Sequence, residues 1–350
     1  MKAAVWYGAK DIRVEEREIS AVSSNQVKIK VAWAGICGSD LHEYSVGPIT
    51  IPANEPDRIT GVQAPLTMGH EFSGVVEEVG SDVSGFKPGD KVAVNPLIIS
   101  GTHKDPLVDM YKGFAFVGLN SDGGFADFVV VDQKNVVKLP EDMSLEYAAL
   151  IEPTAVAVQG IKESGLKLGE SVAVFGAGPI GLLTIIAAKA AGAKEIFAFD
   201  LSDTRLQKAK EVGATHAINS GQQNPVEYIR SIYPDGVDRA FEVAGVAPTF
   251  NQAISVTRAR GVVTIVSIFE KPIEFSPMQL TASGVHLAST LAYEPDVFET
   301  TVKLIASGQI DPSPVITDHI ELEEIVEKGF EALIKDKSQA KILVKLSGEK

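Results

Sequence analysis

The strongest constraint on the fold is a glycine-rich turn between an apolar strand and an apolar helix. Residues 171–175 read SVAVF, which is typical of a strand buried on both faces, and residues 176–181 read GAGPIG. A helical pattern begins at Pro179 and continues to about residue 191, just before Gly192. A strand that turns tightly into a helix in this way predicts a nucleotide-binding βαβ unit.

Each glycine of this turn has its own role in binding a dinucleotide. Gly176 permits the tight turn, Gly178 lets a pyrophosphate approach the backbone, and Gly181 allows close packing of helix on strand. The helix N-terminus then faces the phosphates. Because glycine-rich turns are common, the prediction depends on the strand before the turn and the helix after it.

An acidic residue ends the next predicted strand, where the adenosine ribose would bind. Asp200 lies 19 residues after Gly181 and follows the apolar residues 195–199. A carboxylate there accepts hydrogen bonds from the ribose hydroxyls and repels a 2′-phosphate, so NAD is predicted rather than NADP. Its alternative role is to cap the helix that begins at Ser202 or Asp203. The predicted cofactor contacts are Gly176, Gly178, Pro179, Ile180, Gly181, Asp200 and Arg205.

Arg205 leaves one alternative open at this site. An arginine after the acidic residue can hold a 2′-phosphate, which would favour NADP. With Asp200 present, we expect Arg205 to lie against the adenine or the ribose instead.

The chain changes character along its 350 residues, which exceed the usual size of a single core. Up to about residue 150, short β-type segments such as 27–31, 73–79, 91–94 and 128–131 alternate with turns that contain Gly or Pro. From about residue 171, strands and helices alternate, which predicts a doubly wound parallel sheet. After about residue 290, helices over 296–307 and 321–335 precede a strand over 341–346. The fold class is therefore α/β with an additional β-rich domain.

Charge and hydropathy exclude two classes of partner. The formal net charge is −14, whereas phosphate binding needs a basic surface, so nucleic acid is not expected to bind. The longest apolar run, at about residues 180–188, is too short to span a bilayer. Without a signal-peptide pattern at the N-terminus, a cytoplasmic protein is expected.

The only cysteine of the chain, Cys37, has neighbours that suggest a metal site. A single thiol cannot form an internal disulfide or a cysteine-rich zinc knuckle, although it could simply be a buried apolar group. His70 is a candidate second ligand, and a catalytic zinc takes three protein ligands and leaves one position open. Glu152 lies in an otherwise apolar stretch where an unpaired carboxylate would be costly, and it is a candidate third ligand. Glu71 is the alternative carboxylate.

Four segments together resemble the zinc-dependent medium-chain alcohol and polyol dehydrogenases over essentially the whole chain. They read GICGSDLH at 35–42, GHE at 69–71, GDKV at 89–92 and GAGPIG at 176–181. Within this family the chain is most similar to the 2,3-butanediol dehydrogenases, on residues 43–49, 64–72 and 151–157. Sorbitol-type polyol dehydrogenases share the Glu-Pro element at 152–153 and are the nearest alternative.

The resemblance implies a catalytic GroES-like domain at residues 1–155 and 291–350, and a Rossmann NAD-binding domain at 156–290, with the active site in the cleft. It implies one catalytic zinc, held by Cys37, His70 and Glu152, with Glu71 as an exchanging or supporting ligand. Many relatives carry a structural zinc on four cysteines near residues 96–112. That stretch has no cysteine here, and His103 and Asp109 are too few to replace them, so no structural zinc is expected.

The implied reaction is hydride transfer between NAD and a secondary alcohol, with acetoin and 2,3-butanediol as the expected pair. The substrate would be a vicinal diol or hydroxyketone, and its proton would leave through Ser39 and the nicotinamide ribose to His42, which could instead be an ordinary surface histidine. A homodimer or homotetramer is implied. The alternatives are another polyol or secondary-alcohol dehydrogenase, and a non-catalytic relative that binds the nucleotide only.

Overall fold

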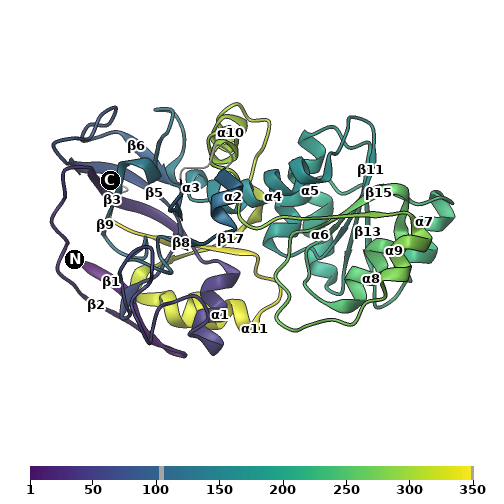
Figure 1. The fold of residues 1–350 in the computed structure, drawn as a ribbon, viewed down its shortest axis with the longest axis horizontal. Coiled ribbons are helices and arrows are strands. Elements are labelled where there is room, and N and C mark those ends of the chain that lie inside the picture. Colours follow the sequence, from purple (N-terminus) through teal and green to yellow (C-terminus); the bar gives the residue numbers. More distant parts are fainter. Residues whose placement is uncertain (102–105, 348–350) are drawn as a thin grey trace. The chain divides into compact units, whose positions relative to one another are not determined.

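The structure, a computed structural model, describes residues 1–101 and 106–347, and its chain divides into two compact units. Unit 1 comprises Met1–Glu152, Glu294–Ala306 and Ile316–Lys350, and unit 2 comprises Pro153–Tyr293 and Ser307–Val315 (Figure 1). The two stretches after residue 293 return the chain to unit 1. Each unit is therefore built from segments that are distant in the sequence.

Unit 1 is organised around a mostly antiparallel sheet with the order β10-β6-β5-β3-β18-β17, and β9 also pairs with β3. Along the central strand β3, buried and half-buried residues alternate at first, and its second half is buried on both faces. The bounds of this sheet are β3 Gln26–Gly35, β5 Glu71–Val79, β6 Lys91–Val94, β9 Phe128–Asp132, β10 Val136–Lys138, β17 Ile316–Glu321 and β18 Lys341–Lys345.

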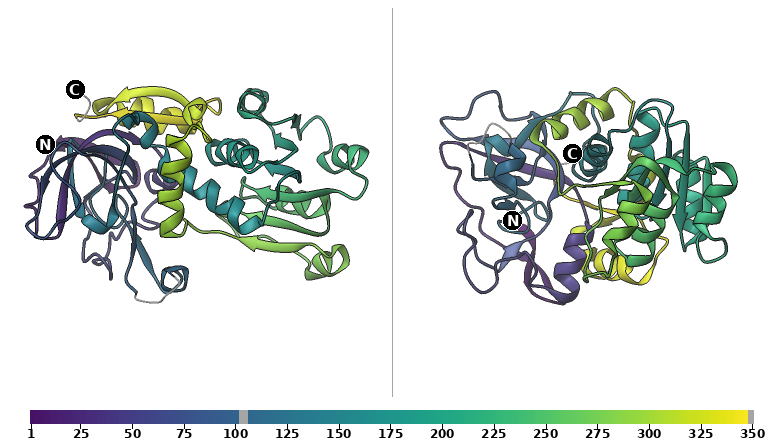
Figure 2. Two further views of the ribbon diagram at one scale, coloured as in Figure 1. Left: turned by 90° about the horizontal axis from the view of Figure 1, so that it is seen from above. Right: turned by 45° about the vertical axis from the view of Figure 1, so that its right-hand side comes forward.

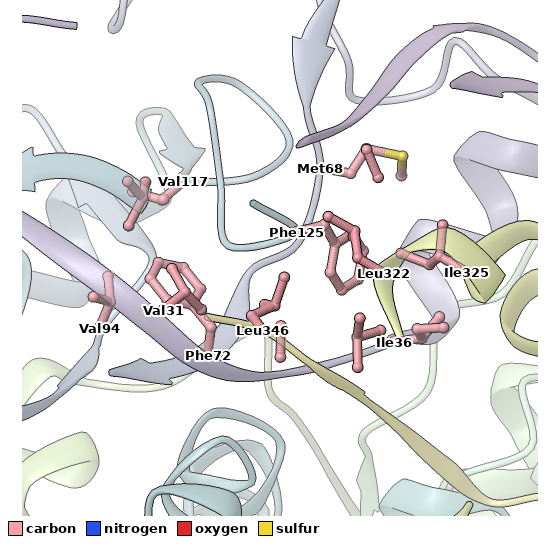
Figure 3. Close-up of a cluster of buried hydrophobic side chains, with 14 of the residues drawn as sticks. Val31, Ile36, Met68, Phe72, Val94, Val117, Phe125, Leu322, Ile325 and Leu346 are labelled. Carbon is pink, nitrogen blue, oxygen red and sulfur yellow. The ribbon is translucent and has the colours of Figure 1, made fainter. Parts of the chain in front are cut away.

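The C-terminal strand of the chain lies inside this sheet, between β3 and β17. β18 pairs antiparallel with β3 and parallel with β17, and Figure 2 shows the yellow C-terminal segment beside the purple N-terminal strands. The hydrophobic core joins the same regions, since Leu322, Ile325 and Leu346 pack with Phe72 and Ile36 (Figure 3). Packing of Ile36 fixes the backbone directly before Cys37.

Smaller elements complete unit 1. Two further sheets have the orders β2-β1-β4 and β7-β8. The bounds of their strands are β1 Lys2–Gly8, β2 Asp11–Glu16, β4 Leu66–Thr67, β7 Leu97–Ile99 and β8 Phe114–Phe116. The helices with most of their residues in this unit are α1 Gly38–Val46, α2 Pro106–Met110, α3 Leu145–Ala148, α10 Pro295–Ala306 and α11 Glu331–Lys335, with a short 3-10 turn at Gln133–Asn135.

Unit 2 is a parallel sheet of the order β13-β12-β11-β14-β15-β16. Helices α5 and α6 pack together, as do α7 and α8, and right-handed crossovers place these pairs on opposite faces. This is the predicted doubly wound arrangement, and the fold class is confirmed. The strands are β11 Ser171–Phe175, β12 Glu195–Asp200, β13 His216–Asn219, β14 Val237–Glu242, β15 Thr257–Ile265 and β16 His286–Ser289. The helices are α4 Ile151–Ser164, α5 Pro179–Ala190, α6 Asp203–Val212, α7 Pro225–Ile232, α8 Ala247–Val256, α9 Pro277–Ser283 and the 3-10 turn Ser313–Val315.

The regular helix predicted over 321–335 is wrong. The structure has a 3-10 turn at Leu322–Glu324, a π-helix at Ile325–Phe330 and only then α11. Gly329 approaches the core so closely that a Cβ there would lie 2.6 Å from Cδ1 of Ile36. The helix widens where its backbone packs this tightly, and periodicity alone could not reveal that contact.

The sequence prediction also missed α1, which carries two of the predicted site residues, and strands β16 and β17.

In the described part of the chain, no helix combines the length and the apolar character needed to cross a membrane.

Candidate metal centre and nucleotide site

Strand register brings the candidate metal ligands together. In the antiparallel pair of β3 and β5, Gly35 at the end of β3 lies opposite Glu71 at the start of β5. The chain leaves β3 through Ile36 and Cys37, and Cys37 is the N-cap of α1. His70 directly precedes β5, so two segments more than thirty residues apart in sequence meet at one edge of the sheet.

Cys37, His70 and Glu71 form a compact group whose ligand atoms all lie within 4.8 Å of one another. His70 and Glu71 are buried, and Cys37 is half-buried, which leaves one side of the group open to a substrate. Ligand atoms of a shared zinc, at about 2.0–2.3 Å from the metal, would also lie within this distance of one another. A thiolate, an imidazole and a carboxylate are the donor types that zinc prefers, so the residues fit this metal.

A residue that sequence reasoning missed, Asp40, orients the candidate ligands. Its Oδ1 lies 3.3 Å from Nδ1 of His70, and its Oδ2 accepts a hydrogen bond from the backbone N–H of Cys37 at 3.0 Å. The Asp40 side chain has no exposed surface. A carboxylate beside Nδ1 leaves Nε2 of the ring for a metal, as in carboxylate–histidine–zinc sites. The available signal was an acidic residue three positions after Cys37 in the first turn of a helix.

The remaining nitrogen of His70 faces Ser39. Ser39 Oγ lies 3.2 Å from Nε2 of His70. Burial opposes the charged form of the ring, but the negative charges of Asp40 and Cys37 outweigh it and raise the pKa of His70 well above its usual value. The same negative charges would attract a metal cation, whose binding releases the proton from such a ligand.

Glu71 is held by a second residue that sequence reasoning missed, Lys341 at the start of β18. Lys341 Nζ donates to Oε1 of Glu71 at 2.8 Å, to Oε2 at 2.7 Å and to the carbonyl of Ile36 at 3.0 Å. Both side chains are buried. Burial opposes the charge of Lys341, but the carboxylate of Glu71 and the charges of Cys37 and Glu152 raise its pKa. The signal was a lysine that begins the terminal strand and is followed by three apolar residues.

Glu152, the predicted third ligand, is not among the three residues of the compact group. It is the second residue of α4 and is 6% exposed. Its charge contributes to the raised pKa of Lys341, so its carboxylate belongs to the same electrostatic environment. The structure thus brings Glu71 close to Cys37 and His70, with both of its oxygens already engaged by Lys341.

The two residues of the predicted proton relay lie on α1. Ser39 is in its first turn, and His42 is three residues further on, which places the two side chains on one face of the helix. Both are half-buried. Ser39 is thus within reach of the metal group, and His42 lies further from it along the helix.

The stretch expected to lack a structural zinc is only partly described. His103 lies outside the described residues. Asp109 is buried, and its Oδ1 forms an ion pair with Lys112 at 3.1 Å.

The glycine turn of unit 2 has the geometry expected of a phosphate site. Gly176 has a φ of +103°, a left-handed conformation that favours glycine. A Cβ on Gly181 would overlap the carbonyl of Gly176, so the helix packs directly on the turn. A Cβ on Gly178, the N-cap of α5, would meet nothing within 4 Å. That open space in front of a helix N-terminus suits a pyrophosphate.

Asp200 ends β12 as predicted and organises the turn. Its Oδ2 accepts from the backbone N–H of Ala177 at 2.8 Å, and its Oδ1 accepts from Ser202 N at 2.9 Å. Ser202, whose hydroxyl accepts from Arg205 N, is the N-cap of α6, so the capping alternative for Asp200 is wrong. The Arg205 guanidinium lies 4.0 Å from Asp200 and would partly neutralise it.

Comparisons with known proteins cover both units. The family model for the alcohol dehydrogenase GroES-like domain matches residues 23–141, and the model for zinc-binding dehydrogenases matches residues 179–307. A relative, (R,R)-butanediol dehydrogenase of Bacillus subtilis (strain 168), is 45% identical over 346 residues, which is 99% of each chain. Sorbitol dehydrogenase of the same organism is 34% identical, over 93% of this chain and 91% of the relative.

Solved structures agree with this similarity. The crystal structure of 2R,3R-butanediol dehydrogenase from Bacillus subtilis matches with a TM-score of 0.94 and 44% identity, over 99% of each chain. Fold and sequence similarity therefore extend over the metal group and the glycine turn alike.

Proposed function

Because this chain belongs to the family of zinc-binding alcohol dehydrogenases, we propose that it interconverts acetoin and 2,3-butanediol by hydride transfer with NAD(H). The observation that carries the proposal is 45% identity over nearly the whole chain to a butanediol dehydrogenase. Zinc and a nicotinamide dinucleotide are the cofactors of such an enzyme, and its substrate is a small molecule. In this proposal unit 1 is the catalytic part and unit 2 binds the cofactor.

Cys37, His70 and Glu152 hold a single catalytic zinc, and no structural zinc is present. Glu71 serves as an exchanging ligand, since its ion pair with Lys341 competes with the metal for its oxygens. Asp40 supports His70 from the opposite side of the ring. Equal zinc occupancy in Glu152→Gln and wild type, with loss of zinc in Glu71→Gln, would instead make Glu71 the permanent ligand.

When bound, zinc supplies Lewis acidity that makes the substrate hydroxyl more acidic. Ser39 Oγ, which lies 3.2 Å from Nε2 of His70, would accept the hydroxyl proton there, and His42, three residues further along α1, would release it to solvent. NAD+, when bound, would accept a hydride from the carbinol carbon, so that the alcohol would become a ketone and NADH and one proton would be formed. A vicinal diol needs a further polar contact for its second oxygen.

On the cofactor side, Asp200 accepts from the adenosine ribose hydroxyls and selects NAD. The phosphates lie in the open space before Gly178, along the backbone of residues 176–181. Arg205 lies beside the adenine or ribose, with its charge directed towards Asp200.

The proposed assembly is a cytoplasmic homodimer or homotetramer that forms through unit 2. Strand β16 ends the parallel sheet and exposes Leu287, whose relative exposure is 37%. An edge strand of this kind can pair with a second copy. A monomeric mass by light scattering would contradict this assembly.

Steady-state kinetics with acetoin and NADH, with zinc counted in the same sample, test the function. Acetoin, the butanediol stereoisomers and sorbitol are compared at equal zinc occupancy. We expect kcat/KM to be at least about tenfold higher for acetoin than for the best polyol, a difference of about 1.4 kcal/mol in transition-state binding. A preference for sorbitol would make the chain a polyol dehydrogenase, and NADH binding without turnover of any substrate would indicate a non-catalytic relative.

A further inference from the structure

Glu242, the last residue of β14, is a carboxylate with no exposed surface. Its Oε1 accepts from the backbone N–H groups of Ala244 and Gly245, both at 3.0 Å, and from the Thr249 hydroxyl at 2.7 Å. Its Oε2 accepts from Gly245 N at 3.2 Å and from the Ser267 hydroxyl. These donors are all neutral. Hydrogen bonds to an ionised acceptor are stronger than neutral ones, so this carboxylate fixes the donors firmly.

Apart from Thr249, which is in α8, the donors belong to the loops that follow two neighbouring strands. Residues 243–246 follow β14, and residues 266–269 follow β15, which pairs with β14 so that Ile265 lies opposite Glu242. The loops also touch directly, because a Cβ on Gly245 would lie 2.6 Å from the carbonyl of Ile268. Glu242 is therefore the side chain through which one loop is hydrogen-bonded to the other.

The order of the strands indicates which half of the cofactor these loops face. The phosphate turn follows β11, and Asp200, at the end of β12, is on the adenosine side. A dinucleotide crosses the carboxyl edge of such a sheet at the point where the strand order reverses. The second half of the dinucleotide must then extend in the opposite direction from β11, over the ends of β14 and β15.

The same loops offer surfaces that suit a flat, partly apolar ring. Val246 and Ile268 are 47% and 65% exposed. The first loop also contacts the phosphate turn, since a Cβ on Gly176 would lie 3.0 Å from the carbonyl group of Val243. A displacement of this loop would therefore also displace the phosphate turn, at the point where the nicotinamide half of the cofactor is joined to the pyrophosphate.

We propose that Glu242 is a positioning residue for the nicotinamide half of the cofactor. It fixes the loops 243–246 and 266–269 in one arrangement and makes no contact with the adenosine half. The inference rests on the proposed NAD function and deepens it. It predicts that disturbing Glu242 weakens binding of the whole dinucleotide but not of ADP-ribose, which lacks the nicotinamide ring.

The test measures dissociation constants for NADH and ADP-ribose, together with kcat and KM, on the zinc-loaded full chain. Ser267→Ala removes the hydrogen bond between the Glu242 side chain and the second loop, and Glu242→Ala removes all the hydrogen bonds of that side chain but keeps those of its backbone carbonyl to the second loop. We expect Glu242→Ala to weaken NADH binding at least about tenfold, which corresponds to about 1.4 kcal/mol, and to lower kcat. Ser267→Ala should weaken NADH binding about threefold, and ADP-ribose binding should stay within about twofold in both variants.

Two further variants separate positioning from general stability. Glu242→Gln keeps an oxygen for Ala244, Gly245 and Thr249 and can donate its amide to Ser267, so it should restore NADH binding to within about threefold of wild type. Ser171→Ala removes a similar hydrogen bond between a serine and a carboxylate. Ser171 donates to Asp238 at the amino ends of β11 and β14, away from the proposed cofactor site. This substitution should lower stability without changing the ratio of the two dissociation constants.

Each outcome has a defined meaning. Equal weakening of NADH and ADP-ribose by Ser267→Ala and Glu242→Ala, or no weakening of either, would overturn the positioning role. If Glu242→Ala does not fold, Ser267→Ala decides the question alone. Failure of the wild-type chain to bind both ligands would refute the proposed NAD site itself, whereas binding of NADH without turnover of acetoin would refute only the substrate.

Discussion

Replacing Lys341 with methionine should show how strongly the buried ion pair between Lys341 and Glu71 affects metal binding, and how strongly metal binding affects the stability that this ion pair provides. The substitution leaves an unbranched apolar side chain that is one heavy atom shorter, and it removes the donor to Glu71 Oε1, Glu71 Oε2 and the Ile36 carbonyl. A buried carboxylate that loses the cation paired with it costs about 3–5 kcal/mol of unfolding free energy. We expect a loss of this size in the zinc-free protein.

With zinc bound, the loss should be smaller, because a metal held by Cys37 and His70 would lie close enough to Glu71 to stabilise its carboxylate. If zinc compensates about 2 kcal/mol, linkage requires that Lys341→Met bind zinc about 30-fold more tightly than wild type. The assay is urea unfolding with and without zinc, combined with a competitive zinc titration. Both measurements must give the same difference.

Two controls make this experiment decisive. Lys345→Met places the same substitution on the same strand at an exposed position, and it should change stability by no more than about 0.5 kcal/mol. Adding Glu71→Gln to Lys341→Met removes both charges, and should recover much of the stability lost in the zinc-free protein. A loss below about 1 kcal/mol in Lys341→Met, or an equal loss with and without zinc, would refute the reasoning.

Three further predictions concern the metal, the cofactor and the fold. Cys37→Ser should lose most of the bound zinc and all measurable turnover while its NADH dissociation constant stays within about twofold; full activity without zinc would contradict the ligand role. Asp200→Ala should weaken NADH binding about tenfold and narrow the preference for NADH over NADPH, as measured by fluorescence titration of both. The Tyr44 hydroxyl and two lysines lower the pKa of Glu331 to about 2, so this carboxylate stabilises the fold above pH 4.5 and loses that effect as the pH falls towards 2. Glu331→Gln should therefore lower the urea midpoint at pH 7, and its difference from wild type should shrink below pH 4.5; a constant difference down to pH 2 would contradict this assignment.

The nucleotide site of unit 2 could be predicted from the sequence in detail, because consecutive residues specify each of its elements. Strand β11 has the predicted bounds, helix α5 begins at the predicted Pro179, and Asp200 ends β12. A buried parallel strand, a glycine turn and a helix are specified by consecutive residues, and neighbouring parts of the chain form the site. Glu242 was missed because its role depends on the pairing of β14 with β15, which sequence spacing does not show.

The candidate metal site of unit 1, in contrast, depends on contacts between segments that are distant in the sequence. The sequence contains Cys37, His70, Glu71 and Glu152 as candidates. The register of β3 against β5 brings the first three together, whereas Glu152 lies in α4. Asp40 could in principle have been found, since it lies three residues from Cys37 in the first turn of α1. Lys341 could not, because it lies 270 residues from Glu71 in the sequence and reaches it only after β18 has paired with β3.

The sequence by itself therefore determined the fold class, the cofactor type and the set of residues able to bind a metal. Tertiary structure alone decided which carboxylate lies beside Cys37 and His70, and that its charge is balanced by a lysine near the C-terminus. The physical reason is that a short-range pattern fixes the conformation of a segment, whereas a buried charge is tolerated only if folding brings a partner to it.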